Sequence, residues 1–275
     1  MPIKLIITDL DGTLLGEDHQ TISERNKTAL EKAAQRGITI ALGSGRTYGV
    51  LKNVLRQTDA IDYVMMSNGA ALMNNRTGEQ TQVGEIPYTL WKPLYDLLKQ
   101  YRAVFEVYYE GYSYIEKEAR ERFVNEWIPQ SFLEELTENM IVVDSLPEFL
   151  EGKPLEKFDV IQTPEESIEG LTRELSCRTE FAVTSSLPGN MEINLKGVDK
   201  GEGTRGLCRL LGISTSEVMA FGDANNDLAM MRTAGYSYAM ENATEEIKEA
   251  ARYRTASNVD DGVAAAIEKL LHEEL

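Results

Sequence analysis

The chain has 275 residues, 42% of them hydrophobic and 27% charged, which is an ordinary composition for one large or two modest globular domains. Its 45 acidic and 28 basic side chains give a formal net charge of −17, which argues against nucleic acid and anionic membrane surfaces as partners. Two cysteines in a chain of this length are no disulfide framework. The presence of only two histidines argues against serine–histidine catalysis and against a histidine-rich zinc site.

The first apolar run, residues 5–7, predicts a short buried strand that ends in Asp9-Leu10-Asp11-Gly12-Thr13. Side chains at i and i+2 of an extended chain point to the same side, so Asp9 and Asp11 are expected to converge beyond the strand's carboxyl end. Two close carboxylates bind a divalent cation, or divide the work of nucleophile and acid/base. Taken alone, the segment is equally compatible with a plain Asp-Gly turn.

The next segments alternate between helix and strand. Thr21-Ile22-Ser23-Glu24 is a capping-box pattern, and the helix it begins is expected to stop near Gly37. A strand over 38–42 ends in Gly43-Ser44-Gly45-Arg46, and another over 63–66 ends in Ser67-Asn68-Gly69-Ala70, with a helix between them. This order predicts right-handed parallel crossovers whose strand ends share one edge of the sheet.

From about Gly84 the pattern changes. It predicts a hairpin over 104–115, helices over 91–101, 120–127 and 165–177, and strands over 158–162, 180–185 and 191–195, as in an α+β unit. After Gly197 the first style returns, with a strand over 217–221, a helix over 227–232 and a strand over 236–240. We therefore predict a doubly wound, mainly parallel, Rossmann-like α/β core over 1–84 and 190–275, with an inserted α+β cap over 85–189.

Three further signals lie at strand or helix ends of this core. The hydroxyl and small neighbours of Ser44 suit a bound anion, although a glycine-rich turn is more often only a turn. Lys200 lies at a helix N-terminus, where the dipole disfavours a cation, so its placement makes sense if it faces a phosphate. Asp223 can complete an oxygen-ligand set for a hard cation, while Asn226 and Asp227 can also simply cap the next helix.

In this order, the four segments resemble the haloacid dehalogenase superfamily, and most closely its Cof-type phosphatases of subfamily IIB. Asn68-Gly69-Ala70, Glu192-Ile193 and Gly197-Val198-Asp199-Lys200-Gly201 also look like that group. The resemblance covers both core segments, and over roughly 84–189 it covers only length, position and strand–helix style. It implies a cap of the C2B type, inserted after the second motif, that closes as a lid and selects the substrate.

The resemblance also implies roles for individual residues. Asp9 is the implied nucleophile, forming an aspartyl-phosphate, and Asp11 the implied acid and base. Mg²⁺ would be held by Asp9, by the backbone carbonyl of Asp11 and by Asp223, with support from Asp227. The implied phosphate-binding groups are Ser44, Lys200, Asn226 and the amides of Leu10 and Gly45. Arg46, Asn68 and the tyrosines near Glu110 are further candidates for contact with the substrate.

Two details refine the resemblance. The family often has threonine where this chain has Ser44, and the serine keeps the hydroxyl. Asp11 argues against the dehalogenase branch, because a departing halide needs no proton. The implied enzyme is thus a magnesium-dependent phosphatase that acts on small phosphorylated metabolites, with sugar phosphates as the first expectation.

Two alternatives stay open. A phosphomutase of the phosphomannomutase type would share the core motifs and require a sugar bisphosphate activator. A non-catalytic phosphometabolite-binding protein would have no need for intact Asp9, Asp11, Lys200 and Asp223, which weighs against it. No apolar run reaches membrane-span length and the N-terminus lacks a signal-peptide layout, so we expect a cytoplasmic monomer or small homo-oligomer.

Overall fold

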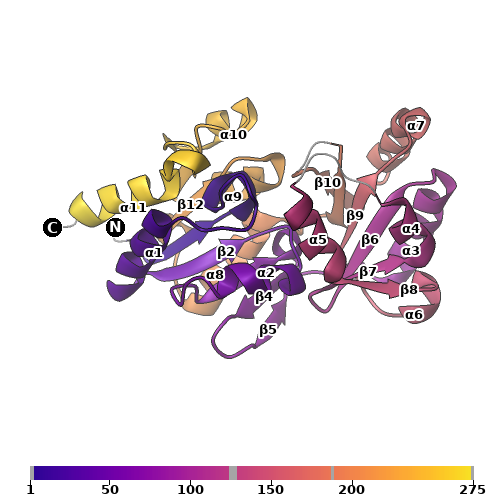
Figure 1. Ribbon diagram of the computed structural model, residues 1–275, viewed down its shortest axis with the longest axis horizontal. Helices are drawn as coiled ribbons and strands as arrows, with labels where there is room; N and C mark the ends of the chain where they lie inside the picture. Colours follow the sequence, from indigo (N-terminus) through magenta and orange to yellow (C-terminus); the bar gives the residue numbers. More distant parts are fainter. Residues whose placement is uncertain (1–2, 124–128, 187–188, 274–275) are drawn as a thin grey trace. The chain divides into compact units, whose positions relative to one another are not determined.

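A computed structural model describes residues 3–123, 129–186 and 189–273 (Figure 1). The chain divides into two compact units, each with its own sheet. The first unit comprises Met1–Arg46, Leu51–Val83 and Asp199–Leu275, and the second comprises Thr47–Val50 and Gly84–Val198. No helix among the described residues is both long enough and apolar enough to cross a bilayer.

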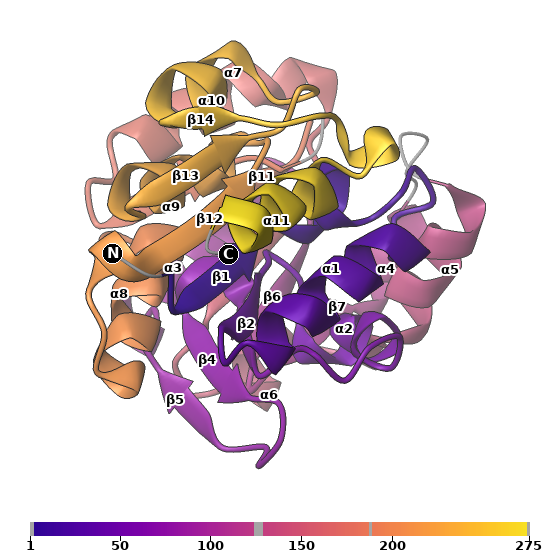
Figure 2. The same ribbon diagram turned by 90° about the vertical axis from the view of Figure 1, so that its left-hand side faces the viewer.

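The first unit is built on an eight-stranded sheet (Figure 2). Its strand order is β14 (Tyr253–Arg254), β13 (Tyr236–Ala239), β12 (Val218–Gly222), β1 (Leu5–Thr8), β2 (Thr39–Gly43), β3 (Tyr63–Met66), β4 (Ala71–Asn74) and β5 (Gln80–Gln82). All neighbours from β14 to β3 are parallel, while the pairs β3–β4 and β4–β5 are antiparallel. Central β1 pairs with β12 on one side and β2 on the other, so the order in which strands are added to the sheet reverses there, and open α/β sheets bind ligands at such a point.

Apolar side chains fill both faces of the central strands, as expected for parallel strands covered by helices. Residues 5–7 have no exposed surface. Helix α1 (Glu24–Gln35) packs against α11 (Gly262–Glu273), and α8 (Lys200–Leu211) packs against α9 (Leu228–Thr233). Helix α10 (Glu245–Ala250) also belongs to this unit, and so does α2 (Tyr48–Leu55) from Leu51 onward.

The start of α1 differs from the expected capping box. Ser23, rather than Thr21, is the N-cap residue, and its side chain accepts a hydrogen bond from the backbone N–H of Asn26. The hydroxyl and backbone N–H of Thr21 instead donate to the carboxylate of Asp18, at 2.5 and 2.9 Å. Thr21 therefore closes a local turn with Asp18, and Ser23 caps the helix instead.

The second unit contains a six-stranded mixed sheet. Its order is β10 (Phe181–Thr184), β11 (Met191–Leu195), β9 (Lys157–Gln162), β6 (Val104–Tyr109), β7 (Tyr112–Glu116) and β8 (Met140–Val143). Only the pair β7–β8 is parallel. Its helices are α3 (Tyr88–Gln100), α4 (Lys117–Arg122), α5 (Gln130–Glu138), α6 (Leu146–Phe149) and α7 (Glu165–Ser176).

An apolar core lies between the helices and the sheet of this second unit. Trp91 of α3 packs near Phe158 of β9 with ring centroids 6.4 Å apart, and Phe105 of β6 lies 5.8 Å from Phe158. Part of the helix expected over 120–127 lies outside the described residues. The predicted class, a doubly wound α/β core sheet with an inserted α+β unit, is confirmed.

Candidate active site

The first predicted site residue follows directly on the central strand. The backbone N–H of Asp9 donates to the carbonyl of Phe221 at 3.1 Å, which continues the β1–β12 ladder by one residue. The Asp9 side chain is 7% exposed, and its Oδ1 accepts a hydrogen bond from Lys200 Nζ at 2.6 Å. Lys200 Nζ is also 2.6 Å from Asp227 Oδ1, so one fully buried ammonium joins two carboxylates.

Asp223 completes a group of three carboxylates. One oxygen from each of Asp9, Asp223 and Asp227 lies within 4.8 Å of the others. Thr13 Oγ1 donates to Asp223 Oδ1 at 2.8 Å, which orients that carboxylate. Gly12 has φ +74°, and a Cβ atom there would lie 2.4 Å from Asp223 Oδ2, so only glycine lets the loop after β1 come this close.

Asp227 shapes the loop that carries Asp223. Its Oδ2 accepts hydrogen bonds from the backbone N–H groups of Asp223 at 3.0 Å and Ala224 at 3.1 Å. Asp227 is fully buried, with one oxygen on this loop and the other on Lys200. The side chain therefore fixes the loop and the lysine together.

The charges of this group do not balance. Burial and repulsion from Asp227 raise the pKa of Asp9 well above its usual range, although Lys200 opposes the shift. The same two causes raise the pKa of Asp223 to about 7, against the hydrogen bond from Thr13. Burial alone would lower the pKa of Lys200, but Asp227 and Asp9 raise it, so the lysine stays charged. One cation among three carboxylates leaves an excess of negative charge that a hard divalent cation would offset.

Asp11 points to different partners. Arg46 Nε and Nη2 donate to its two oxygens at 2.9 and 2.5 Å, and His19 Nδ1 lies 2.7 Å from its Oδ1. Arg46 Nη2 also donates to the carbonyl of His19 at 2.7 Å. Burial alone would raise the pKa of Asp11, but Arg46 and His19 together hold it well below its usual range. Asp11 is thus an ionised carboxylate in this arrangement.

The loop after β2 carries Ser44 and Gly45, two of the predicted phosphate-binding residues. Ser44 is buried, and its Oγ accepts a hydrogen bond from the backbone N–H of Arg46 at 3.1 Å. Its own N–H donates to the carbonyl of Met65 at 2.9 Å. Gly45 between them is half-buried, and Leu10, the other residue expected to offer an amide, is buried. The arrangement keeps the loop close to the end of β3.

Asn226 and Asn68 meet although 158 residues separate them. Asn226 Nδ2 donates to Asn68 Oδ1 at 3.2 Å, and both side chains are buried. The residues predicted to act in catalysis, metal binding and phosphate binding therefore lie in the first unit, at the ends of β1, β2, β3 and β12 and at the start of α8, whereas the tyrosines near Glu110 lie in the second unit.

Two residues near the site were given no role by sequence reasoning. Thr13 belongs to the first motif, but nothing in its spacing shows that its hydroxyl reaches Asp223, 210 residues away. His19 lies in a loop with φ +58°, and its contact with Asp11 depends on that left-handed backbone. Neither contact has a sequence signal, because each is set by tertiary packing.

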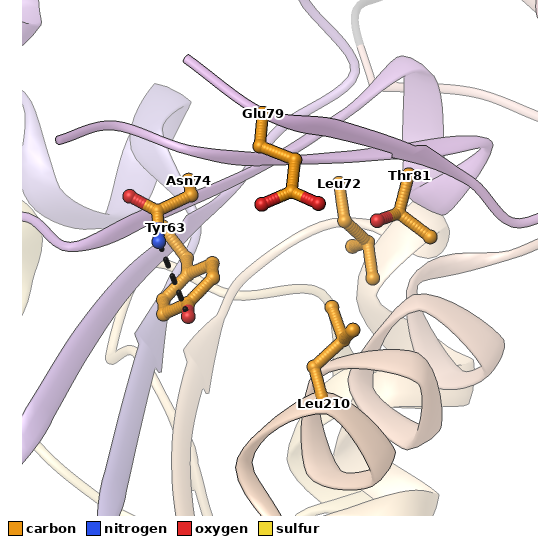
Figure 3. Close-up of a pocket in the computed structure, with 6 residues that line it drawn as sticks. All are labelled: Tyr63, Leu72, Asn74, Glu79, Thr81 and Leu210. Carbon is orange, nitrogen blue, oxygen red and sulfur yellow. Dashed lines mark hydrogen bonds between the residues drawn. The ribbon is translucent and has the colours of Figure 1, made fainter. Parts of the chain in front are cut away.

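A separate open pocket of about 100 Å³ lies in the same unit (Figure 3). It is lined by Tyr63, Leu72, Asn74, Glu79, Thr81 and Leu210. These side chains come from β3, β4, β5, α8 and the turn before β5, and Asn74 Nδ2 donates to the Tyr63 hydroxyl at 3.4 Å. None of the predicted catalytic or phosphate-binding residues lines this pocket.

The family of the chain follows from its sequence. The profile of the haloacid dehalogenase-like hydrolases matches residues 6–267. The chain belongs to this family. Hydrolases of the family generally use a divalent metal, and the acidic group of Asp9, Asp223 and Asp227 is a fitting place for one.

Two curated relatives extend over nearly the whole chain. YxeH of Bacillus subtilis (strain 168) is 32% identical over 272 residues, which cover 98% of this chain and 98% of YxeH. The 5-amino-6-(5-phospho-D-ribitylamino)uracil phosphatase YcsE of the same strain is 28% identical over 266 residues, covering 96% of this chain and 94% of YcsE.

Solved structures of this hydrolase family share the fold. A haloacid dehalogenase-like hydrolase from B. subtilis superposes with a TM-score of 0.83 at 26% identity, covering 97% of this chain and 99% of that one. The subclass IIB sugar phosphatase BT4131 gives a TM-score of 0.81 at 24% identity, covering 97% and 98%, which shows the common fold alone. The predicted membership of the haloacid dehalogenase superfamily and the phosphatase class are confirmed.

Proposed function

We propose that this haloacid dehalogenase-like hydrolase is a Mg²⁺-dependent phosphatase that hydrolyses phosphate monoesters of small metabolites through an aspartyl-phosphate on Asp9. The observation that carries the proposal is the buried Asp9 carboxylate, bonded to Lys200 and within 4.8 Å of oxygens of Asp223 and Asp227. A nucleophile needs a fixed orientation, and phosphoryl transfer needs its negative charge neutralised. This cluster offers both.

The reaction has two steps. A carboxylate oxygen of Asp9 attacks phosphorus as the bond to the substrate's alcohol oxygen breaks, and Asp11 gives that oxygen a proton. Water then attacks the phosphoryl group of the intermediate, Asp11 takes a proton from the water, and inorganic phosphate and free Asp9 result. The ionised Asp11 bound to Arg46 is ready for the second step, whereas the first requires a proton on Asp11 and hence the loss of that ion pair.

Asp9, Asp223 and the backbone carbonyl of Asp11 would hold the metal, with Asp227 in support. Three carboxylate oxygens in one small volume match the preference of Mg²⁺ for hard oxygen ligands. The ion, when bound, offsets the charge that develops on the phosphoryl oxygens. Lys200, Ser44 and Asn226, with the amides of Leu10 and Gly45, would bind those oxygens.

Sugar and sugar-alcohol phosphates are the proposed substrate class. The support is the relative YcsE, whose name places the phosphate on a ribityl chain. Residues 85–189 are proposed to act as the lid that selects the organic part of the substrate. Both cysteines are free thiols, which is consistent with a proposed site of action in the cytoplasm.

Phosphate release tests the proposal. The protein, freed of metal with EDTA and supplied with hexose or ribitol phosphates, should release no inorganic phosphate. Adding Mg²⁺ should start release without any bisphosphate activator. Conversion of one hexose phosphate isomer into another without release would contradict a phosphatase and indicate a phosphomutase, while binding without either reaction would indicate a sensor.

The Asp11→Asn variant tests the acid. An alkyl alcohol is a poor leaving group that needs a proton, whereas p-nitrophenolate leaves without one. The variant should therefore lose about 10²–10⁴-fold in kcat/KM with a hexose phosphate, and clearly less with p-nitrophenyl phosphate. Equal losses with both substrates would show that Asp11 does not protonate the leaving group.

A further inference from the structure

The loop after β3 has an unusual backbone. Ser67, Asn68 and Gly69 follow one another with φ angles of +52°, +58° and +92°, and all three are buried. Left-handed backbone is costly for residues other than glycine, and asparagine tolerates it better than most. Such a run persists only where its surroundings fix it. It therefore indicates that the loop holds neighbouring segments in place.

The backbone of this loop contacts two segments of the proposed phosphate site. The N–H of Asn68 donates to the carbonyl of Ser44 at 3.1 Å. Gly69 abuts the start of α8, because a Cβ atom on Gly69 would lie 2.3 Å from the carbonyl oxygen of Asp199, the residue before Lys200. The loop thus fixes the Ser44 loop and the lysine helix relative to each other.

The side chain of Asn68 reaches a third segment. Its Oδ1 accepts from Asn226 Nδ2 at 3.2 Å, and the two residues are 3% and 6% exposed. Within the described part of the chain, Asn226 Oδ1 has no hydrogen-bond partner. A buried amide oxygen without a donor is unfavourable, so the pair as it stands is incompletely satisfied.

The two amides have a second arrangement. Rotating each by 180° exchanges its oxygen and nitrogen, so that Asn68 Nδ2 donates to Asn226 Oδ1. Asn226 then turns its NH₂ group away from Asn68, where it is available as a donor. The oxygens of a phosphate-monoester dianion carry no hydrogen, so they only accept hydrogen bonds. The first arrangement uses one N–H of Asn226 on Asn68, whereas the second leaves both N–H groups of Asn226 for phosphate oxygens.

We infer that Asn68 is a positioning residue, which directs the NH₂ group of Asn226 toward a phosphate oxygen of the substrate. Asn68 acts through Asn226 rather than by touching the substrate, unlike the direct contact suggested by its sequence motif. The inference rests on the proposed function, because it assumes that phosphate binds beside Asn226.

A double-mutant cycle tests the inference. Asn68→Gly keeps the left-handed backbone and removes only the amide, and Asn226→Ala removes its target. Each should weaken the binding of inorganic phosphate, measured by calorimetry with Mg²⁺ present, by about tenfold. The double variant should bind no more weakly than Asn226→Ala, because Asn68 has nothing left to orient. Losses that multiply would overturn the inference.

A second variant checks the orientation itself. Asn68→Asp keeps the shape of the side chain but can only accept, so it holds the NH₂ group of Asn226 away from phosphate. Its phosphate affinity should fall below that of Asn68→Gly, and affinity equal to the parent's would contradict the inference. Arg102→Gly, at another left-handed residue in the other unit, controls for the glycine substitution and should bind phosphate as the parent does.

The same proteins separate this inference from the proposed function. A parent that binds phosphate but releases none from any ester would overturn the proposed function alone. A parent that hydrolyses esters, with independent effects at Asn68 and Asn226, would overturn this inference alone. Thermal unfolding of each variant should show the cooperative transition of the parent, which ties the binding losses to the site.

Discussion

Replacing Asp9 with asparagine is expected to lower kcat by on the order of 10⁴-fold or more, with every phosphate monoester tested. Asparagine has nearly the same shape, but its amide does not attack phosphorus. The change also removes a buried carboxylate whose pKa is raised by burial and by Asp227, so it relieves repulsion. The free energy of unfolding in EDTA should therefore be unchanged or higher, although activity is lost.

Two measurements make this result specific. Mixing the parent with substrate and quenching with acid should trap phosphate on the protein at Asp9, and the Asp9→Asn variant should trap none. Asp62→Asn is a matched control, since Asp62 pairs with Arg76 at the surface, and it should keep the parent's kcat. Hydrolysis by Asp9→Asn at the parent's rate would show that another group attacks phosphorus.

Replacing Lys200 with methionine is expected to cost about 3–5 kcal/mol of unfolding free energy, besides abolishing hydrolysis. Lys200 is fully buried and neutralises Asp9 and Asp227, each at 2.6 Å, so its loss leaves buried carboxylates unpaired. Urea unfolding in EDTA measures the cost. Lys248→Met is the matched control, because Lys248 pairs with Glu245 at the surface. This control should lower the free energy of unfolding by only about 0–1 kcal/mol.

The cost of removing Lys200 should depend on pH. The pKa of Asp9 is raised well above its usual range and that of Asp223 to about 7, so the folded state binds more protons than the unfolded state between about pH 4 and 7. Stability then falls as pH rises, and more steeply without Lys200. The variant should be more destabilised at pH 8 than at pH 5, and Mg²⁺ should stabilise it more than the parent. A cost independent of both pH and Mg²⁺ would contradict this account of the cluster.

The sequence was most informative where chain order and strand ends determine position. Residues 5–7 and 218–221 are apolar runs that Asp9 and Asp223 follow at the second residue, and parallel pairing alone brings such ends to one edge. That argument predicted the neighbourhood of Asp9 and Asp223. Asp227 was expected to cap a helix or support a metal, and the structure shows it bonded to both Lys200 and the Asp223 loop.

The sequence was least informative where packing rather than pattern decides. Strands β4 and β5 were not predicted, because Ala71–Asn74 and Gln80–Gln82 are short and show no clear alternation. The ion pair between Arg46 and Asp11 was also missed, although both residues were candidates, since motif order does not tell which way a long side chain turns. The parallel pair β7–β8 joins segments about 25 residues apart in sequence, which no local signal indicates.

The pairing of β1 with β12 has a consequence for how the chain folds. Leu5 lies opposite Val218, so the central strand of the first sheet lacks one neighbour until more than 200 residues have been synthesised. The second unit, with its own sheet and apolar core, has all its strands before that point. We expect it to fold first on the ribosome, while the apolar β1 keeps an open edge that is prone to wrong pairing. Such long-range closure is intrinsically slow, and we expect Asp9, at the end of β1, to reach Lys200 only in this last stage of folding.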